Sequence, residues 1–261
     1  MVITQAVILV GGKGTRLNKT VSDRPKPMAE VAGRPFIEWV LLAIREQGIR
    51  RIVLGTGFKG DMISGYFGDG SRLGLNIEYA QEHEPLGTAG ALRHAWKLTA
   101  ARTLLVMNGD SYCPFDLKRF AEAHAKAEAR ATLWLVRAED VSRYGSVEIA
   151  GDGSVKAFYE KSSAQRCGLI SAGMYLLDRD VIATVPEGTM VSLEKEVLPK
   201  LIGKGLYAIA GQGPFVDIGT PESYTLASTV LAEELKHLAT ILAESARLRH
   251  AKEREPTHGI C

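Results

Sequence analysis

The stretch that most constrains how this chain folds is residues 6–28. Five apolar residues, Ala6 to Val10, run directly into a loop with three glycines within four positions. Glycine accepts positive φ and lets backbone N–H groups approach a ligand, so a glycine cluster at a strand end suits phosphate oxygens. Two cationic side chains, Arg16 and Lys26, belong to the same stretch, which an ordinary surface turn does not need. The stretch therefore predicts a strand that opens onto a bound polyphosphate.

The first half of the chain alternates short apolar runs with segments of helical periodicity. The pattern predicts strands at 51–56, 75–80 and 103–107, and helices at 36–48, 61–67 and 88–97. Strands that alternate with helices predict an α/β fold, a Rossmann-like, doubly wound and mostly parallel sheet with right-handed crossovers. In such a sheet, ligands bind at the carboxyl ends of the strands.

The second half has a different rhythm, with strands joined by short connections. We expect strands at 131–137, 145–150, 155–160 and 170–177, with a hairpin turn at 151–153. These strands predict an antiparallel extension, packed on the same sheet, that covers a substrate. A capped helix at 192–202, a strand at 206–210 and one long helix from 221 to about 251 complete the prediction.

Composition narrows the classes of partner. The chain has 261 residues, 46% of them apolar and 24% charged, which is ordinary for a globular protein. The net charge of +2 is too small to gather nucleic acid, so we expect a small-molecule partner. The three cysteines lack a Cys-x-x-Cys spacing, which favours a reducing cytoplasm over a disulfide framework or a zinc site. Without a signal sequence or a run of 18 apolar residues, we expect no export and no contact with a membrane.

The glycine loop fails two well-known phosphate-binding patterns. A dinucleotide fingerprint needs a third glycine where Leu17 stands, and a Walker A loop needs a closing Gly-Lys-Ser/Thr that is absent. Arg16 and Lys26 instead favour a polyphosphate held by side-chain cations as well as by backbone donors. Lys26 lies between two prolines, whose fixed φ angles hold its backbone stiffly.

Two aspartates are candidate metal ligands. Asp110 follows the apolar strand at 103–107, although it could instead be a turn residue that caps a helix starting near Asp116. Asp217 lies between a strand and the last predicted helix. Magnesium prefers oxygen ligands and takes one or two carboxylates together with substrate phosphates. The two aspartates and the glycine loop together therefore predict a Mg²⁺ site.

At this point the sequence resembles a known family, the sugar-1-phosphate nucleotidylyltransferases. The resemblance covers roughly residues 3–225 and rests on Gly11-Gly-Lys-Gly-Thr-Arg-Leu17, Pro25-Lys-Pro27, Glu84-Pro-Leu-Gly-Thr-Ala-Gly90, Asn108-Gly-Asp110, Glu160-Lys161 and Asp217-Ile-Gly-Thr-Pro221. It implies a nucleotidyltransferase catalytic domain at 1–225, with the antiparallel extension binding sugar, followed by a C-terminal helix and tail at 226–261. The implied reaction joins a sugar 1-phosphate to a nucleoside triphosphate and releases pyrophosphate.

The resemblance also implies roles for individual residues. Asp110 and Asp217 would hold Mg²⁺, and the catalytic residues would be Arg16, Lys26, Asp110 and Lys161. The nucleotide-binding residues would be Leu9, Gly11, Gly12, Gly14, Thr15, Arg16, Lys26, Glu82, Gly87, Thr88, Asn108 and Gly109. The sugar phosphate would contact Tyr144, Gly145, Glu160, Lys161, Ser171 and Gly173. Ser171 and Phe215 depart from the family pattern, which usually has Asn and Trp there, and both departures concern sugar contacts.

The choice of base rests on Glu82, which by the same resemblance faces the base. A carboxylate accepts two hydrogen bonds, which matches the adjacent N1–H and N2–H₂ donors of guanine, whereas uracil and thymine offer one donor there. We therefore expect GTP. The alternative is that Glu82 is only a solvated loop charge.

Several alternatives stay open. The chain looks most like the D-glycero-α-D-manno-heptose 1-phosphate guanylyltransferases of bacterial surface-glycan pathways, and mannose 1-phosphate is the nearest rival substrate. A nucleotide-binding oxidoreductase and a catalytically silent regulator that binds nucleotide sugars are the alternatives from other classes. A leucine stripe in the last helix, at 231, 235, 238 and 242, either packs on its own domain or forms the seam of a homodimer, which we slightly favour.

Overall fold

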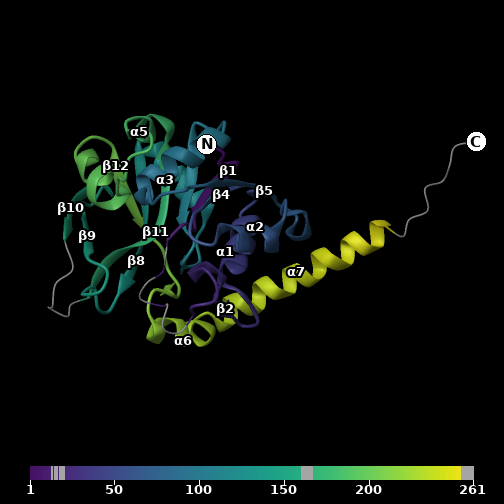
Figure 1. The fold of residues 1–261 in the computed structure, drawn as a ribbon. Coiled ribbons are helices and arrows are strands. Elements are labelled where there is room, and N and C mark those ends of the chain that lie inside the picture. The colour runs from purple at the N-terminus through teal and green to yellow at the C-terminus, as the bar shows by residue number, and fades with distance from the viewer. Residues whose placement is uncertain (13, 15–16, 18–20, 160–166, 254–261) are drawn as a thin grey trace, which may run out of the picture.

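The fold is built on one mixed sheet of seven strands (Figure 1). This computed structural model describes residues 1–12, 14, 17, 21–159 and 167–253, and the side chains of all of these except 244–253. The sheet order is β12-β8-β11-β6-β1-β4-β5. The strands are β1 (Gln5–Leu9), β4 (Arg51–Thr56), β5 (Asn76–Gln81), β6 (Thr103–Asn108), β8 (Ala131–Ala138), β11 (Gly168–Asp178) and β12 (Leu206–Ala210). Two further short pairs are formed by β2 (Glu30–Val31) with β3 (Arg34–Pro35), and by β7 (Ser111–Tyr112) with β13 (Val216–Asp217).

Helices cover both faces of this sheet because its central strands are apolar on both sides. Ile8 of β1 joins a core with α1 (Phe36–Glu46), α2 (Gly60–Phe67), α4 (Leu117–Lys126) and α7 (Ala232–Glu253). Its neighbour Val7 joins the opposite core with α3 (Gly87–Ala95), α5 (Arg179–Ala183) and the turns at 193–201. Successive residues of a strand point to opposite faces, so an uninterrupted apolar strand needs cover on both.

The strand directions confirm a mostly parallel α/β sheet. Strand β1 pairs in parallel with β4 and with β6, β4 with β5, and β12 with β8. Strand β11 runs antiparallel to both of its neighbours, β6 and β8. The predicted antiparallel part therefore enters the main sheet through β11.

The predicted hairpin with its turn at 151–153 is confirmed, and Val147 and Val155 from its two strands pack into one of the cores of the main sheet. Strands β9 (Ser146–Ile149) and β10 (Val155–Tyr159) form a two-stranded sheet of their own instead of extending the main one. An isolated bridge from Ser154 to Tyr207 links the hairpin to β12. The tight turn before Ser154, where the Asp152 carboxylate accepts from the Ser154 N–H at 2.9 Å, folds the hairpin back on itself.

Two helix predictions are also corrected. Ser192 does cap a turn, because its Oγ accepts from Lys195 N at 3.2 Å, but the turn is π-helical at Leu193–Val197 and 3₁₀-helical at Leu198–Leu201. Pro199 has no N–H for a regular α-helical bond, so the helix cannot continue through it. The single C-terminal helix is in fact α6 (Pro221–Val230) and α7, separated at Leu231.

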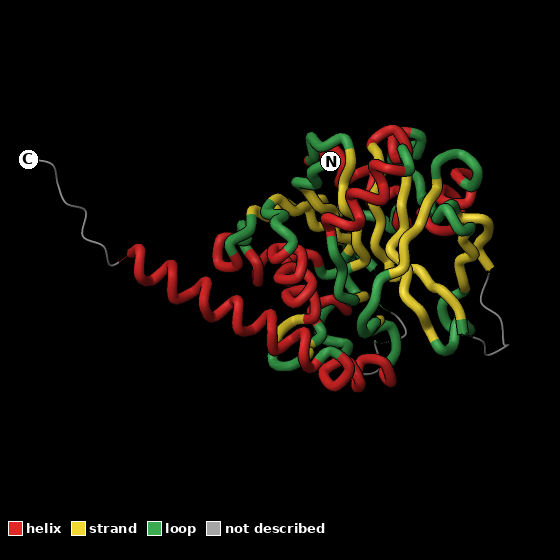
Figure 2. The backbone as a smooth tube through the Cα atoms, turned by 180° about the vertical axis from the view of Figure 1, so that it is seen from behind, coloured by secondary structure: helices red, strands yellow, loops and turns green. Residues whose placement is uncertain are grey.

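The break at Leu231 turns the leucine stripe toward the body of the protein. Leu231, Leu235 and Leu238 are at most 3% exposed and belong to the core that contains α1, and Leu242 packs against that core. The stripe therefore packs on its own chain, and our preference for it as a dimer seam is wrong. Beyond this contact α7 projects away from the body (Figures 1 and 2). Among the described residues, no helix is long and apolar enough to cross a membrane.

Candidate active site at the carboxyl ends of the strands

The ends of β1 and β6 bring two predicted motifs together. Leu9 ends β1 and Asn108 ends β6, and these residues are paired in the parallel register. The N–H of Gly109 donates to the carbonyl of Leu9 at 3.0 Å. The start of the glycine loop therefore lies directly beside Asn108-Gly-Asp110, as expected for a site at the carboxyl edge of the sheet.

A short strand pair places the second aspartate beside the first. In the β7–β13 pair, Asp217 is opposite Ser111, and the N–H of Ile218 donates to the carbonyl of Asp110 at 3.0 Å. The helix-cap alternative for Asp110 does not hold, because Asp116 caps α4 by accepting from Arg119 N at 2.9 Å. Two carboxylates from distant parts of the chain thus lie side by side.

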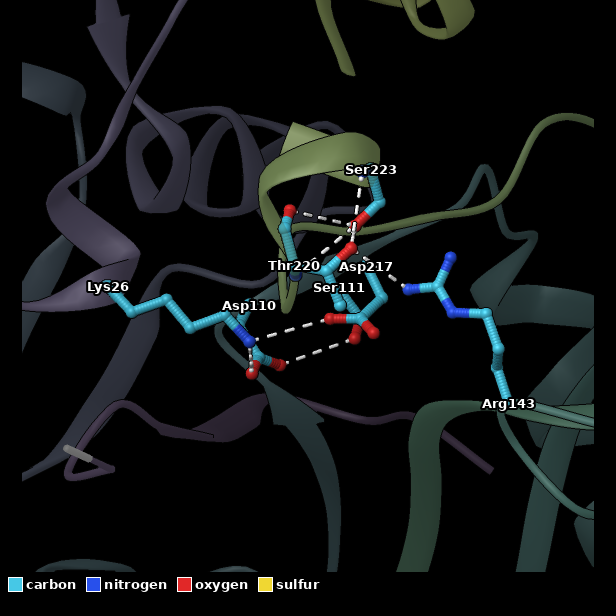
Figure 3. Close-up of polar contacts among 7 residues, drawn as sticks. All are labelled: Lys26, Asp110, Ser111, Arg143, Asp217, Thr220 and Ser223. Atoms are coloured by element: carbon cyan, nitrogen blue, oxygen red, sulfur yellow. Dashed lines mark hydrogen bonds and ion pairs between the residues drawn. The ribbon is translucent and has the colours of Figure 1, made fainter. Parts of the chain in front are cut away.

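Lys26 bridges this acidic pair (Figure 3). Its Nζ lies 2.6 Å from Oδ2 of Asp110 and 3.5 Å from Oδ1 of Asp217. The side chain of Lys26 is only 9% exposed, so the ammonium is largely withdrawn from bulk water. It occupies the place that a cation between two carboxylates would take. No group of three or more His, Cys, Asp or Glu suited to a metal occurs among the described residues. One or two carboxylates are enough for Mg²⁺, which usually keeps several waters and binds substrate phosphates as well.

The segment that carries Asp217 is fixed on its other side by α6. Thr220 and Ser223 form a capping box at the start of this helix, and Arg143 Nη2 donates to Thr220 Oγ1 at 3.3 Å (Figure 3). The neighbouring ring of Tyr144 meets Phe215 edge to face, with ring centroids 5.5 Å apart. The predicted sugar-side residue Tyr144 therefore packs next to the strand that presents Asp217.

Two adjoining hollows lie beside the acidic pair. The larger, of about 720 Å³, is lined by most of the predicted nucleotide residues, namely Leu9, Gly11, Gly12, Glu82, Gly87, Thr88 and Asn108, and reaches Asp110. The smaller, of about 240 Å³, includes Gly12, Gly14, Lys26 and Asp110. Gly14 has a φ of +59°, and a Cβ there would lie 2.8 Å from Cβ of Lys26. Gly109 joins the two strands instead of lining either hollow.

Glu82 faces the larger hollow. Its Oε2 accepts from Leu86 N at 3.2 Å, while Oε1 lies close enough to Gly11 and Gly57 that a side chain at either glycine would collide with it. Partial burial raises the pKa of the Glu82 carboxyl, and the Leu86 N–H offsets this in part. Glu82 is therefore held by the protein over the hollow, which disfavours the interpretation of a solvated loop charge.

The sugar-side residues of β11 meet the nucleotide-side residues at Asn108. Gly173 has a φ of +71°, and a Cβ on it would lie 2.8 Å from Asn108 Nδ2. Ser171 is on the same strand, next to a bulge between Ser171 and Met174. Gly145 also has positive φ, in the turn that precedes β9.

Four predicted site residues, Thr15, Arg16, Glu160 and Lys161, lie outside the residues that the structure describes.

The chain matches the family described as "Nucleotidyl transferase" over residues 5–234. The protein belongs to the nucleotidyl transferase family. The matched range includes every predicted site residue, from Leu9 to Asp217.

Named relatives of this family are similar over most of the chain. Mannose-1-phosphate guanylyltransferase of Mycobacterium tuberculosis is 40% identical over 87% of this chain, which spans 64% of that relative's length. D-glycero-alpha-D-manno-heptose 1-phosphate guanylyltransferase of Aneurinibacillus thermoaerophilus is 36% identical, covering 89% of this chain and 99% of the relative. The crystal structure of HddC from Yersinia pseudotuberculosis complexed with GMP-PN is 36% identical, with a TM-score of 0.77, and covers 87% of this chain and 99% of that one.

The sequence did not single out every residue around the nucleotidyl transferase site. Gly57, Phe58 and His83 also line the larger hollow. Gly57 and Phe58 directly follow β4, so their position at the end of a predicted parallel strand was the signal that could have found them.

Another hollow, of about 1110 Å³, lies at the opposite end of the sheet. It is lined by Arg102, Thr103, His124 and Asp178 among others, and by none of the predicted site residues. Thr103 is the first residue of β6, so this hollow opens at the amino end of that strand, away from the candidate active site.

Proposed function

We propose that the protein is a sugar-1-phosphate guanylyltransferase, which transfers GMP from GTP to a sugar 1-phosphate and releases pyrophosphate. The observation that carries this proposal is the convergence of Lys26, Asp110 and Asp217 beside a hollow faced by Glu82. The position of this group at the carboxyl edge of the sheet, in a chain of the nucleotidyl transferase family, supports it. The length match with the heptose enzyme of Aneurinibacillus supports it as well.

The proposed reaction requires positioning and charge neutralisation rather than a general base. A sugar phosphate is largely dianionic at neutral pH, so its oxygen attacks the α-phosphorus without prior deprotonation. We propose that Lys26 and Arg16 contact the triphosphate, that Lys161 holds the attacking phosphate in line, and that Glu160 holds the sugar. Asp110 and Asp217 would hold Mg²⁺, which when bound neutralises charge on the reacting phosphates.

The proposed base is guanine. The Glu82 carboxylate, held over the larger hollow, can accept from both N1–H and N2–H₂ of guanine. Uracil and thymine present one donor at the corresponding edge and would leave one carboxylate oxygen unpaired. The names of the guanylyltransferase relatives agree with this proposal.

The proposed sugar is D-glycero-α-D-manno-heptose 1-phosphate or a related manno-heptose. The support is the relative of that name, which this chain spans over 99% of its length. Mannose 1-phosphate is the second candidate, because the Mycobacterium relative named for it has the higher identity, 40%. The product would be a GDP-sugar for bacterial surface glycans, made in the cytoplasm.

A homodimer remains a proposal, although not through the leucine stripe. Its support is now α7, which projects beyond the body and offers a partner a long helix (Figure 1). Light scattering of the purified protein measures the mass directly.

A pyrophosphate-release assay tests the proposed activity. GTP, UTP, CTP and dTTP are each combined with mannose 1-phosphate and with the manno-heptose 1-phosphate. Release that depends on both GTP and a sugar phosphate is expected. A clear preference for UTP contradicts the guanine proposal, and no release with any pair favours a silent nucleotide-sugar-binding regulator.

A further inference from the structure

A chain of hydrogen bonds beneath the candidate site joins the nucleotide loop to the sugar-side strand. Thr88, at the start of α3, donates to Oε2 of Glu194 at 2.7 Å. The hydroxyl of Tyr175, in β11, donates to Oε1 of the same carboxylate at 3.2 Å. Ser171 in turn donates to the Tyr175 oxygen at 3.3 Å. Glu194 is therefore the shared acceptor between two halves of the site.

The hydrogen bonds from Ser171 through Tyr175 to Glu194 all run in one direction because Tyr175 is buried. Its side chain is 1% exposed, and burial together with the neighbouring Glu194 carboxylate raises the pKa of the phenol well above its ordinary value. The phenol therefore stays protonated, donates a hydrogen bond to Glu194 and accepts one from Ser171. The Ser171 oxygen also accepts from Gly173 N at 3.3 Å, which leaves one lone pair for a ligand.

The turn that carries Glu194 is tied to the nucleotide loop from a second direction. The N–H of Leu193 donates to Thr88 Oγ1 at 2.7 Å, so the Thr88 hydroxyl accepts from this turn and donates back to it. Main-chain bonds from Ala89 N to Val191 O and from Val191 N to Leu86 O, both 2.9 Å, extend the contact. The π-helical turn is thus anchored to the loop that lines the larger hollow.

We propose that Glu194 is a positioning residue that sets the sugar-side strand in register with the nucleotide loop, and that it makes Ser171 face the substrate as a hydrogen-bond acceptor for a sugar hydroxyl. This inference rests on the proposed function. Thr88 lines the larger hollow, whereas Glu194 does not, so Glu194 acts through Thr88 and Tyr175. Breaking the hydrogen bonds at the Tyr175 end of this series weakens sugar recognition while the nucleotide contacts stay in place.

Two variants break this series of hydrogen bonds, and a third is a matched control. Tyr175→Phe removes only the hydroxyl. Glu194→Gln replaces one oxygen of a carboxylate that accepts from three hydroxyls, those of Thr88, Tyr175 and Ser192, so at least one of them loses its acceptor. Glu196→Gln changes the same residue type in the same turn. Among the described residues, the Glu196 carboxylate accepts a hydrogen bond only from Ser192 N, at 2.8 Å. Thermal unfolding of all three shows whether they fold.

The readouts separate positioning from general stability. At saturating GTP, Tyr175→Phe and Glu194→Gln are each expected to raise the KM for the preferred sugar 1-phosphate roughly 2- to 10-fold, the effect of losing one neutral hydrogen bond between Ser171 and a sugar hydroxyl. For Tyr175→Phe, which does not touch Thr88, calorimetric titration is expected to give an unchanged affinity for GDP and a weakened affinity for GDP-mannose, which also fills the sugar side. Glu196→Gln is expected to match the wild type.

The outcomes distinguish this inference from the function on which it rests. A wild-type protein that turns over no sugar 1-phosphate with any triphosphate overturns the proposed function and the inference together. An active wild type whose sugar KM is unchanged in both chain-breaking variants overturns only the positioning role. If Tyr175→Phe does not fold, Ser171→Ala and its combination with Glu194→Gln decide the matter: additive effects on sugar KM contradict a shared chain.

Discussion

The ammonium of Lys26 lies 2.6 Å from Asp110 Oδ2 and 3.5 Å from Asp217 Oδ1, so its single positive charge offsets part of the charge of two carboxylates from distant parts of the sequence. Two carboxylates this close repel each other unless a cation lies between them. The ammonium occupies that place in the structure, and a divalent ion would compete with it. Binding of a metal would therefore free Lys26 to contact phosphate.

Replacing Lys26 should separate metal binding from activity. Lys26→Met keeps an apolar stem but removes the positive charge, so Mn²⁺ is expected to bind several-fold more tightly, as followed by titration calorimetry. The kcat/KM with GTP is expected to fall at least about tenfold, because a charged contact to the triphosphate is lost. Lys97→Met, at a surface lysine paired with Glu187, is the control. Weaker Mn²⁺ binding in Lys26→Met would contradict the competition.

Replacing Asp110 should remove turnover without unfolding the protein. Asp110→Asn keeps the shape of the side chain and removes the charge that a cation needs, so kcat is expected to fall more than about a hundredfold. Thermal unfolding is expected to be close to that of the wild type. Asp180→Asn, which changes an exposed aspartate that pairs with Arg130, is the control. A well-folded Asp110→Asn protein with near-normal activity would rule out the metal assignment.

Replacing Glu82 should reduce the preference for guanine. In Glu82→Gln, one oxygen acceptor is replaced by an amide donor that opposes the donors of guanine. The kcat/KM for GTP is expected to fall roughly 10- to 100-fold, with a much smaller change for UTP. Glu84→Gln, two residues along the same loop and also in the lining of the hollow, is the control. An unchanged ratio of GTP to UTP would show that another residue selects the base.

The raised pKa of Glu82 predicts a pH dependence of guanine binding. The carboxylate must be ionised to accept both hydrogen bonds from guanine. The contribution of Glu82 to guanine binding is therefore fully present above the raised pKa and is lost as the pH falls through it. The affinity for GDP is measured for the wild type and for Glu82→Gln in metal-free buffer from about pH 8 to about pH 5. The ratio of the two affinities is then compared across pH, because the titration of the nucleotide's own phosphate affects both proteins equally and cancels in the ratio. The ratio is expected to shrink toward acid pH. A constant ratio would contradict the role of the ionised form.

For the stability of the unliganded protein, the ionisation of Glu82 has the opposite effect. Burial raises the pKa of Glu82 because it disfavours the ionised carboxylate. The stability that the protonated Glu82 contributes is therefore fully present at acid pH and is lost as the pH rises through the pKa of the folded protein. Glu82→Gln is therefore expected to raise Tm at neutral pH and to leave it unchanged in acid.

The packing of α7 predicts a stability effect that does not depend on oligomeric state. Leu235→Ala removes a side chain that is 3% exposed and packs in the core with α1, and is expected to cost about 2–5 kcal/mol in chemical unfolding. Leu226→Ala, on α6 and 56% exposed, is expected to cost less than about 0.5 kcal/mol. Light scattering of both variants should give the wild-type mass. A loss of dimer in Leu235→Ala with little loss of stability would restore the leucine stripe as a seam.

Local patterns were enough to predict the central strands of the sheet and the position of Asn108-Gly-Asp110 beside the start of the glycine loop. The uninterrupted apolar runs ending at Leu9 and Asn108 predicted central parallel strands, and parallel strands place their carboxyl ends together. The chemistry of two carboxylates at strand ends suggested that Asp110 and Asp217 share a site, but the pairing of Ser111 with Asp217 that brings them together joins segments that no sequence spacing relates.

The prediction of a single C-terminal helix failed because tertiary packing overrode local propensity. The pattern from 221 to about 251 predicts one helix, but the structure has two, α6 and α7, with the buried Leu231 between them. The contact between Glu194 and Thr88 was equally hidden, because it depends on a π-helical turn that has no pattern of its own. The roles of Arg16, Glu160 and Lys161 stay predictions.

The most direct test of the proposed guanylyl transfer is to identify the product. The wild-type protein is incubated with GTP, Mg²⁺ and either the manno-heptose 1-phosphate or mannose 1-phosphate, and the mixture is separated and analysed by mass spectrometry. The account predicts a GDP-sugar formed in equal amount with pyrophosphate. Consumption of GTP without a nucleotide sugar, or formation of a nucleotide sugar from UTP in preference to GTP, would contradict it.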